Sequence, residues 1–442
     1  MTLARRLAPV LAGVFTSTRT RDAQRWISEQ RRRIGGQPHR VRYFHQVDDP
    51  YSSLASQVLG ELSARYDIEI EPHLVGPPPA EAAPERERLE VFARKDAADI
   101  APGYRLAFPR RDAAPDERLL QQASCLLAGA IAAGRFVDVA AGVGRALWDA
   151  DQAGLDEIAR TTPTADPVVT RAALEAGNTL RRRLGHYLGA MFHYGGEWYW
   201  GVDRLWHLER RLQSLGALRS GAVAQPIVRR PDFTDQPVAG SDKRLVLEFY
   251  PSLRSPYTYI VMERVYALSQ RYPVELRLRP LLPMVMRGLP IPRAKRFYIT
   301  LDTKREADDA GVAFGRVSDP VGRPVERAFS LLPWAREHGR EAEFLLSFAR
   351  AAFAEGIDAG EDEGLRRVVE RVGLSWTQAR GHLDREGWRE ELEENRRSLF
   401  AMGLWGVPSF RLLGDDREPD FCTWGQDRLW LVEQNIRRRL GG

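Results

Sequence analysis

The sequence predicts an α/β protein made of two tandem copies of one domain, each interrupted by a helical subdomain. Three observations lead to this prediction. The chain has 442 residues, which is more than one ordinary hydrophobic core holds. Strand-like and helix-like patterns alternate at the beginning of each half. A ten-residue motif that starts at Trp200 recurs at Trp424, and such a recurrence indicates a duplication.

The first fifteen residues contain two arginines and a short apolar run. A secretory signal peptide has this composition, but no small-residue cleavage site follows, and Arg19 and Arg21 come soon after. We therefore expect a surface helix that packs on the first copy.

The first copy opens with a strand pattern over residues 41–48, which leads into Asp49-Pro50-Tyr51 and a helix. Sixteen residues after Pro50 comes Tyr66, and an alternating strand pattern follows it. The second half repeats this order, as Pro256 is followed sixteen residues later by Tyr272 and another alternating strand. The two halves therefore begin with the same unit of strand, helix and strand.

The clearest local signal is the beginning of the second copy. Leu247 and Phe249 belong to a buried-strand pattern, and Ser255-Pro256 supplies a side-chain cap and a residue preset for the first helical position. Apolar residues at helical spacing continue to Arg271. Ser255 thus lies where the unpaired N–H groups of a helix stabilise anions, thiolates included. Capping alone would be an ordinary structural role for this serine.

The far ends of the two copies also match. Residues 200–209 and 424–433 agree at seven of ten positions. Helical patterns fill the middle of each copy, and residues 216–242 are rich in proline and glycine, as expected of a linker. We place the first domain at residues 1–215 and the second at residues 243–442.

The composition is that of a globular protein, with 43% hydrophobic and 28% charged residues. The net charge of +5 comes from basic residues dispersed among acidic ones, whereas a nucleic-acid site needs a concentrated basic stripe. No apolar run approaches the roughly 18 residues of a membrane span. We therefore expect no nucleic-acid partner, no membrane contact and a cytoplasmic location.

Strand, helix and strand, then a helical insert, then strand, strand and helix, is a thioredoxin-like layout. Three blocks of the second copy carry a more specific resemblance: residues 248–257 with Ser255-Pro256-Tyr257, Gly406-Val-Pro-Ser-Phe410 and Trp424-Gly-Gln-Asp-Arg-Leu429. Together they resemble the DsbA-like kappa-class glutathione transferases and 2-hydroxychromene-2-carboxylate isomerases. The resemblance covers nearly the whole second copy, but only the two ends of the first.

The resemblance implies that glutathione is the cofactor. It implies that Ser255 donates a hydrogen bond to the sulfur of bound glutathione, which favours the thiolate of a thiol whose pKa is about 8.5. It also implies that Pro408 is a cis proline and that the backbone of Val407 binds the cysteinyl part of glutathione. An ordinary trans turn at Pro408 is the alternative.

Three further positions match family residues. The resemblance implies that Asp427 pairs with the amino group of glutathione, and that Gln426 and the adjacent N–H groups receive its γ-glutamyl carboxylate. An acidic residue also suits a helix start on structural grounds, and Asp203 holds the equivalent place in the first copy. Lys295 matches a lysine near the glycine end of glutathione or the substrate, and a solvated lysine is the alternative.

Both copies depart from the family pattern. In the second, Ser252 stands where many isomerases have an aspartate, so the isomerase substrate is in doubt. In the first, Asp49 stands for Ser255 and Ala190 for Pro408, and an ionised carboxylate would repel a thiolate. We expect the first copy to be a structural or regulatory domain, so that the protein is a monomer acting as a pseudo-dimer, or a homodimer.

The sequence thus favours a glutathione-dependent isomerase or transferase that acts on a small aromatic or electrophilic compound. A DsbA-type thiol–disulfide oxidoreductase is one alternative, although the two cysteines, Cys125 and Cys422, form no CxxC motif. A non-catalytic protein that binds a peptide or partner chain is another. We expect no metal site, because His186 and His193 have no evident third ligand.

Overall fold

The computed structural model describes residues 3–234 and 243–441. It divides into two compact units. Asp22–Pro231 form the unit that contains the first copy, and Met1–Arg21 join Asp232–Gly442 in the unit that contains the second copy. The N-terminal residues therefore belong with the second copy.

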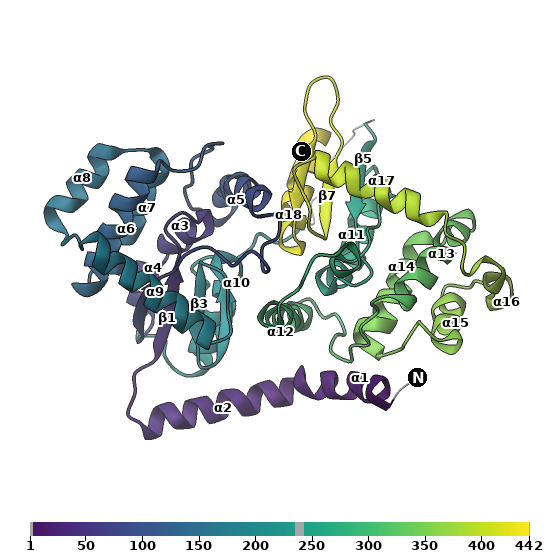
Figure 1. Ribbon diagram of the computed structural model, residues 1–442, viewed down its shortest axis with the longest axis horizontal. Helices are drawn as coiled ribbons and strands as arrows, with labels where there is room; N and C mark the ends of the chain where they lie inside the picture. The colour runs from purple at the N-terminus through teal and green to yellow at the C-terminus, as the bar shows by residue number, and fades with distance from the viewer. Residues whose placement is uncertain (1–2, 235–242, 442) are drawn as a thin grey trace. The chain divides into compact units, whose positions relative to one another are not determined.

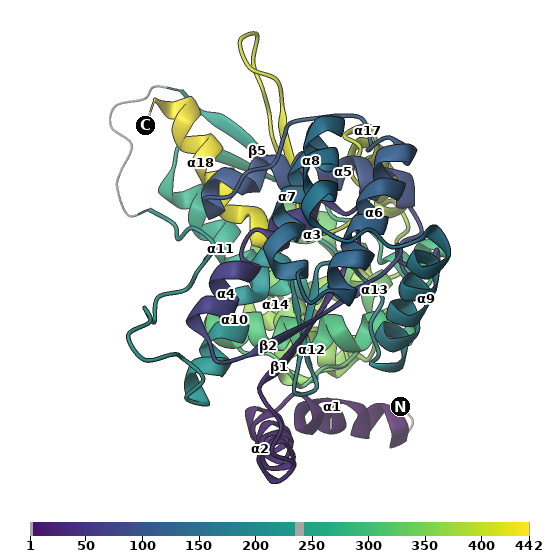
Figure 2. The same ribbon diagram turned by 90° about the vertical axis from the view of Figure 1, so that its left-hand side faces the viewer.

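The first copy is built on a four-stranded mixed sheet in the order β2-β1-β3-β4. β1 and β2 are parallel and lie side by side (Figure 2), whereas β3 pairs antiparallel with both β1 and β4. A parallel pair needs a crossover connection, and α3 and α4 supply it. The elements are β1 (Arg40–His45), α3 (Pro50–Ser56), α4 (Leu59–Arg65), β2 (Glu69–Leu74), β3 (Met191–Tyr194), β4 (Glu197–Trp200) and α10 (Gly201–Ser214).

The second copy has the same topology, and Figure 1 labels its two central strands, β5 and β7. Its sheet has the order β6-β5-β7-β8, with β5 and β6 parallel and β7 antiparallel to both β5 and β8. The elements are β5 (Leu245–Tyr250), α11 (Pro256–Arg271), β6 (Val274–Leu278), β7 (Ser409–Leu412), β8 (Phe421–Trp424), the 3₁₀ turn η5 (Gln426–Arg428) and α18 (Leu429–Leu440). Two sheets with one strand order confirm the predicted α/β fold of two thioredoxin-like copies with helical inserts.

In each copy a helical insert separates the second and third strands along the chain, β2 from β3 and β6 from β7. In the first copy it consists of α5 (Arg86–Ile100), η1 (Ala101–Tyr104), α6 (Glu117–Ala132), α7 (Phe136–Asp149), α8 (Gln152–Thr161) and α9 (Pro167–Arg183). In the second copy it consists of η2 (Met284–Arg287), α12 (Arg293–Asp309), α13 (Arg323–Glu337), α14 (Glu341–Arg350), η3 (Ala351–Glu355), α15 (Asp362–Arg371), α16 (Trp376–Ala379), η4 (Arg380–His382) and α17 (Trp388–Ala401).

One hydrophobic core joins the second sheet to its insert. Phe249 of β5 stacks on Phe410 of β7 with ring centroids 5.3 Å apart. Val265 of α11, Phe329 of α13 and Phe348 of α14 belong to the same buried cluster. Burial of this apolar surface stabilises the sheet and the insert together.

The N-terminal helix α1 (Leu3–Phe15) packs on the second copy, whereas the sequence analysis expected it on the first. The Thr16 hydroxyl contacts the Gly315 carbonyl oxygen at 3.3 Å, and the ring of Phe15 meets that of Phe297 edge-on. Two glycines make room for the helix. A Cβ at Gly315 would come within 2.5 Å of Thr16 Oγ1, and one at Gly356 within 2.5 Å of Pro9 Cβ. This fit depends on residues about 300 positions away, which a local pattern does not reveal.

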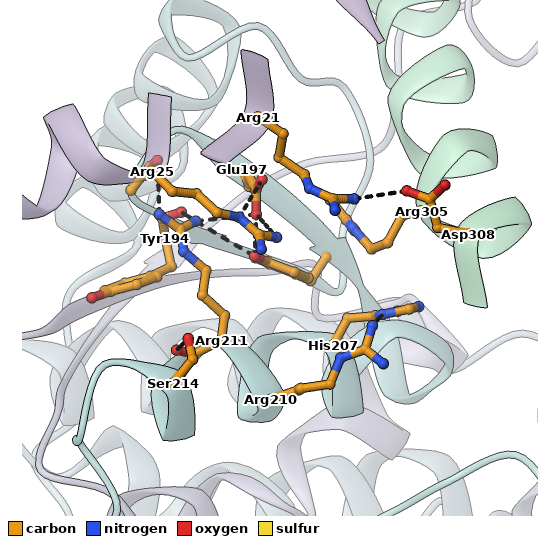
Figure 3. A network of polar contacts seen from close by, with 12 residues as sticks. Arg21, Arg25, Tyr194, Glu197, His207, Arg210, Arg211, Ser214, Arg305 and Asp308 are labelled. Atoms are coloured by element: carbon orange, nitrogen blue, oxygen red, sulfur yellow. Dashed lines mark hydrogen bonds and ion pairs between the residues drawn. The ribbon is translucent and has the colours of Figure 1, made fainter. Parts of the chain in front are cut away.

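The next helix, α2 (Thr18–Ile34), reaches the first copy through its later residues. Arg25 binds Glu197 of β4 with two hydrogen bonds, of 3.0 and 2.9 Å, and Arg211 of α10 binds the same carboxylate at 3.1 Å (Figure 3). At the beginning of α2, Arg21 forms an ion pair with Asp308 of α12 at 3.0 Å. No helix in the described part of the chain is long and apolar enough to cross a membrane.

Candidate functional site

The candidate site begins at the start of α11. Ser255 has an extended backbone (φ −93°, ψ 113°), and its side-chain oxygen accepts a hydrogen bond from the Thr258 N–H at 3.2 Å. This is the predicted N-cap, and Pro256 occupies the first helical position. The Ser255 side chain is partly exposed, and its hydroxyl proton has no acceptor among the described residues. It is therefore available to donate to a ligand.

The loop before β7 lies at the same edge of the sheet. Tyr250, the last residue of β5, pairs with Ser409, the first residue of β7. The Val407–Pro408 peptide bond is cis, as predicted. The Pro408 carbonyl accepts from Gly425 N–H at 2.9 Å, but the main chain of Val407 has no partner within the described ranges. The end of β5, the head of α11 and this loop are thus brought together by one strand pair.

Two tryptophans, Trp405 and Trp424, pack at the loop, and Lys295 lies beside one of them. The indole of Trp424 lies against Gly406, where a Cβ would come within 2.1 Å of the ring. Trp405 packs on Trp424 with ring centroids 5.2 Å apart, and Lys295 Nζ lies 5.8 Å from the centre of the Trp405 ring. Burial lowers the pKa of Lys295 from 10.5 to about 8, because a desolvated ammonium is disfavoured. The structure therefore places Lys295 beside the loop and partly out of solvent.

Gln426 and Asp427 lie at the base of the last helix, in the turn η5, and both are buried. The carboxamide oxygen of Gln426 accepts from Arg264 of α11 at 2.8 Å. Its amide donates to Glu306 of α12 at 2.8 Å and also to Asp427. Both ends of this carboxamide are therefore in use, and any ligand carboxylate at this turn would have to meet main-chain N–H groups. The predicted ligand contacts of Gln426 and Asp427 stay predictions.

Sequence reasoning missed Arg264, Glu306 and Trp405. Arg264 and Glu306 hold Gln426 in place, and Trp405 contacts Lys295. Trp405 adjoins the Gly-Val-Pro block, and that neighbourhood was the available signal. Arg264 and Glu306 lie inside helices with many charged residues, where no local pattern separates a buried partner from a solvated one.

The first copy has a different residue at the equivalent helix start. Asp49 caps α3 and accepts hydrogen bonds from Tyr51 N–H, Ser52 N–H and the Ser52 hydroxyl, at 3.3, 3.0 and 2.8 Å. Burial raises the pKa of Asp49 from 3.8 to about 6. Ala190 N–H donates to the Ser52 hydroxyl at 2.9 Å. Helix start and loop are thus joined directly in this copy.

Residues 246–437 match the family model described as DSBA-like thioredoxin domain, so the second copy is a domain of that class. Among curated proteins, the chain is similar to the 2-hydroxychromene-2-carboxylate isomerase of Pseudomonas putida. The two are 24% identical over 203 residues, which cover 44% of this chain and 95% of the isomerase. This finding confirms the resemblance that the three sequence blocks indicated.

Two solved structures are also similar to this chain. One is a 2-hydroxychromene-2-carboxylate isomerase, with 22% identity and a TM-score of 0.37, covering 44% of this chain and 95% of that one. The other is the cytosolic disulfide reductase DsbM from Pseudomonas aeruginosa with GSH, with 19% identity and a TM-score of 0.33, covering 45% of this chain and 98% of that one.

Proposed function

We propose that the second copy binds glutathione at the head of α11 and uses it to isomerise or conjugate a small aromatic or electrophilic compound. The observation that supports this most directly is Ser255, a partly exposed hydroxyl at the N-terminus of a 16-residue helix, with no internal acceptor for its proton among the described residues. A hydroxyl donor and a helix N-terminus both favour a thiolate over a thiol.

The residues present fit glutathione in three respects. The Val407 main chain has no partner in the described part of the second copy, and it adjoins strand β7, so it can pair with an extended cysteinyl backbone. The Ser255 hydroxyl can donate to sulfur. Lys295 supplies a positive charge beside the loop for the glycine carboxylate or for a developing negative charge on the substrate.

When bound, glutathione supplies a sulfur nucleophile that adds to an electrophilic carbon and then stays, or leaves after a bond rotation. Ser255 acts here as an activator and not as a nucleophile. Its O–H donates to the sulfur, which lowers the thiol pKa, while the proton of the thiol goes to solvent. Asp427 remains the proposed partner of the ligand's amino group.

The isomerase relative supports this class of chemistry, whereas the substrate is open. Ser252 replaces the expected aspartate, and its side chain is buried. Thiol–disulfide chemistry lacks support, because neither cysteine lies at a helix start: Cys125 is in α6, and Cys422 is in β8, where its sulfur is 3.4 Å from that of Met402.

The test compares two serine caps of the second copy. Ser255 accepts from the N–H three residues later, and Ser375 does the same for Gln378 N–H at 3.4 Å, at the start of α16. Ser255→Ala and Ser375→Ala each remove a cap, which costs about 1 kcal/mol of stability. Only Ser255→Ala should weaken glutathione binding in calorimetry, by about tenfold or more, because a hydrogen bond to a charged group is lost.

Thiolate absorbance gives a second readout. In Ser255→Ala the pKa of bound glutathione should return towards about 8.5, whereas in Ser375→Ala it should stay as in the wild type. Equal binding and equal thiolate absorbance in the two variants would overturn the proposed role. If the wild-type protein binds no glutathione at millimolar concentration, glutathione is not its cofactor.

A further inference from the structure

The outward side of α1 is apolar. Leu7, Val10, Leu11 and Val14 are 48, 50, 66 and 60% exposed, and no other helix within the described ranges carries as many exposed large apolar side chains. Their spacing of three, four and seven residues places them on one side of the helix. A surface helix of a globular protein normally turns such a stripe towards the core.

The orientation of α1 is fixed by its other side. Pro9 is buried near Gly356, and Thr16, just past the helix end, is buried against Gly315. Thr16 also donates to the Ala12 carbonyl at 2.8 Å, which ties it to the last turn. Turning the stripe inward would break these contacts. The exposed stripe is therefore a consequence of how the helix is seated on the second copy.

The charge of this segment has one sign. Residues 1–21 include four arginines, Arg5, Arg6, Arg19 and Arg21, and no acidic residue. Arg21 is tied to Asp308, whereas Arg19 is exposed and has no ion pair within the described chain. An apolar stripe with flanking arginines is the composition of helices that lie in the headgroup layer of anionic membranes.

A second copy of the chain would be a poor occupant of the same stripe. Face-to-face pairing of two such helices would bring together two segments whose only charged side chains are arginines, and like charges repel. An anionic surface has the complementary charge.

We propose that α1 docks the protein on an anionic lipid surface, with Leu7, Val10, Leu11 and Val14 in the headgroup and upper acyl layer and Arg19 at the phosphates. The helix lies on the surface and does not span it, in agreement with the finding on membrane-spanning helices. Docking through this segment is independent of glutathione chemistry, because it uses no residue of the candidate site. Composition alone predicts no membrane contact, because it does not show which side of a helix faces out.

The test uses the full-length protein and co-sedimentation with vesicles. One set of vesicles is phosphatidylcholine, and the other is phosphatidylcholine and phosphatidylglycerol in equal parts. Leu11→Glu/Val14→Glu places two carboxylates on the stripe. Its matched control is Val168→Glu/Val169→Glu on α9, where both valines are likewise exposed, at 69 and 59%.

The wild type and the α9 control should bind the phosphatidylglycerol vesicles, and the stripe variant should bind at least about tenfold less. Wild-type binding should weaken at high salt and on pure phosphatidylcholine. Leu11→Gln/Val14→Gln, which adds no charge, should show an intermediate loss. A circular-dichroism melt establishes that each variant is folded.

Three outcomes would overturn the proposal. The wild type could fail to bind phosphatidylglycerol vesicles at low salt. The stripe variant could bind as well as the α9 control. Sedimentation velocity could show that the wild type is a dimer and the stripe variants are monomers, which would make the stripe a contact between two protein chains.

Discussion

The two copies share one sheet order and differ where their first helices begin. In the first copy Asp49 accepts three hydrogen bonds, from Tyr51 N–H, Ser52 N–H and the Ser52 hydroxyl. In the second copy Ser255 accepts one, from Thr258 N–H. Pro50 and Tyr51 are buried, whereas Pro256 and Tyr257 are partly exposed. The same fold thus presents a closed helix start in one copy and an accessible one in the other.

The loop opposite the helix start differs in the same sense. Ala190 N–H donates to the Ser52 hydroxyl in the first copy. Its counterpart in the second copy, Pro408, has no N–H to donate. The Thr258 hydroxyl, which corresponds to that of Ser52, accepts from Ser252 N–H at 3.4 Å. The comparison teaches that a site on a duplicated fold depends on which polar groups stay unused by the protein itself.

A second pair of equivalent residues differs at the far end of each copy. Glu209 and Glu433 both accept from a tyrosine hydroxyl, of Tyr66 at 3.1 Å and of Tyr272 at 2.7 Å. Arg271 forms an ion pair with Glu433 at 3.8 Å. The equivalent arginine of the first copy, Arg65, forms an ion pair with Glu61 instead. Burial raises the pKa of Glu209 from 4.5 to about 7.

The largest expected effect comes from giving the second copy the residue of the first. Ser255→Asp keeps a good N-cap, so the protein should fold. The carboxylate repels the thiolate and the carboxylates of glutathione, and we expect the affinity to fall about 100-fold, or roughly 3 kcal/mol, in calorimetry. Asp49→Ser is the reverse exchange. It should create no second site, because Ser52 and Ala190 still join the helix and the loop. Wild-type affinity in Ser255→Asp would contradict the comparison.

The next effect is on the pH dependence of stability. The folded-state pKa of Glu209, about 7, lies above its ordinary value of 4.5. Between these two pH values the folded state therefore holds a proton that the unfolded state has released, and the free energy of unfolding falls as pH rises from about 4.5 through 7. Glu209→Gln removes this fall, because its side chain does not ionise. At pH 8 the variant should be about 2 kcal/mol more stable than the wild type, and near pH 4.5 the two should be equal.

Hydrogen–deuterium exchange of α10 peptides measures this locally. Glu433→Gln is the matched variant in the second copy. It loses the ion pair with Arg271 and should gain no stability at pH 8. A stability difference between Glu209→Gln and the wild type that is the same at both pH values would show that Glu209 does not titrate in this range.

The smallest effect concerns Lys295. Its pKa of about 8 means that the ammonium is lost just above neutral pH. S-methylglutathione has no thiol to ionise, and its binding to the wild type should weaken as pH rises through about 8. Lys295→Met should bind it about fivefold more weakly at pH 7, without that pH dependence. Lys304→Met, on the same helix, removes a lysine that binds Asp308 at 2.6 Å, away from the loop; it is the control and should match the wild type.

Much of the fold and part of the site could be predicted because their signals are local. The repeated strand, Pro and Tyr spacing identified the duplication, and the cap of α11 by Ser255 follows from the serine–proline pair. The roles of Gln426 and Asp427 in binding stay predictions. Arg264 and Glu306, the partners of Gln426, come from other helices, more than 100 residues away in sequence, and such pairings depend on how the helices pack.

The sequence by itself determined the succession of strands and helices in a duplicated thioredoxin-like layout, and the difference between Asp49 and Ser255. Local propensity and hydrophobic periodicity are sufficient for these features. Only the tertiary structure decided that α1 rests on the second copy with its apolar side outward, and that Lys295 lies half-buried beside Trp405. Both depend on contacts between distant segments, in which the glycine at position 315 or the ring of a tryptophan determines which face can be buried.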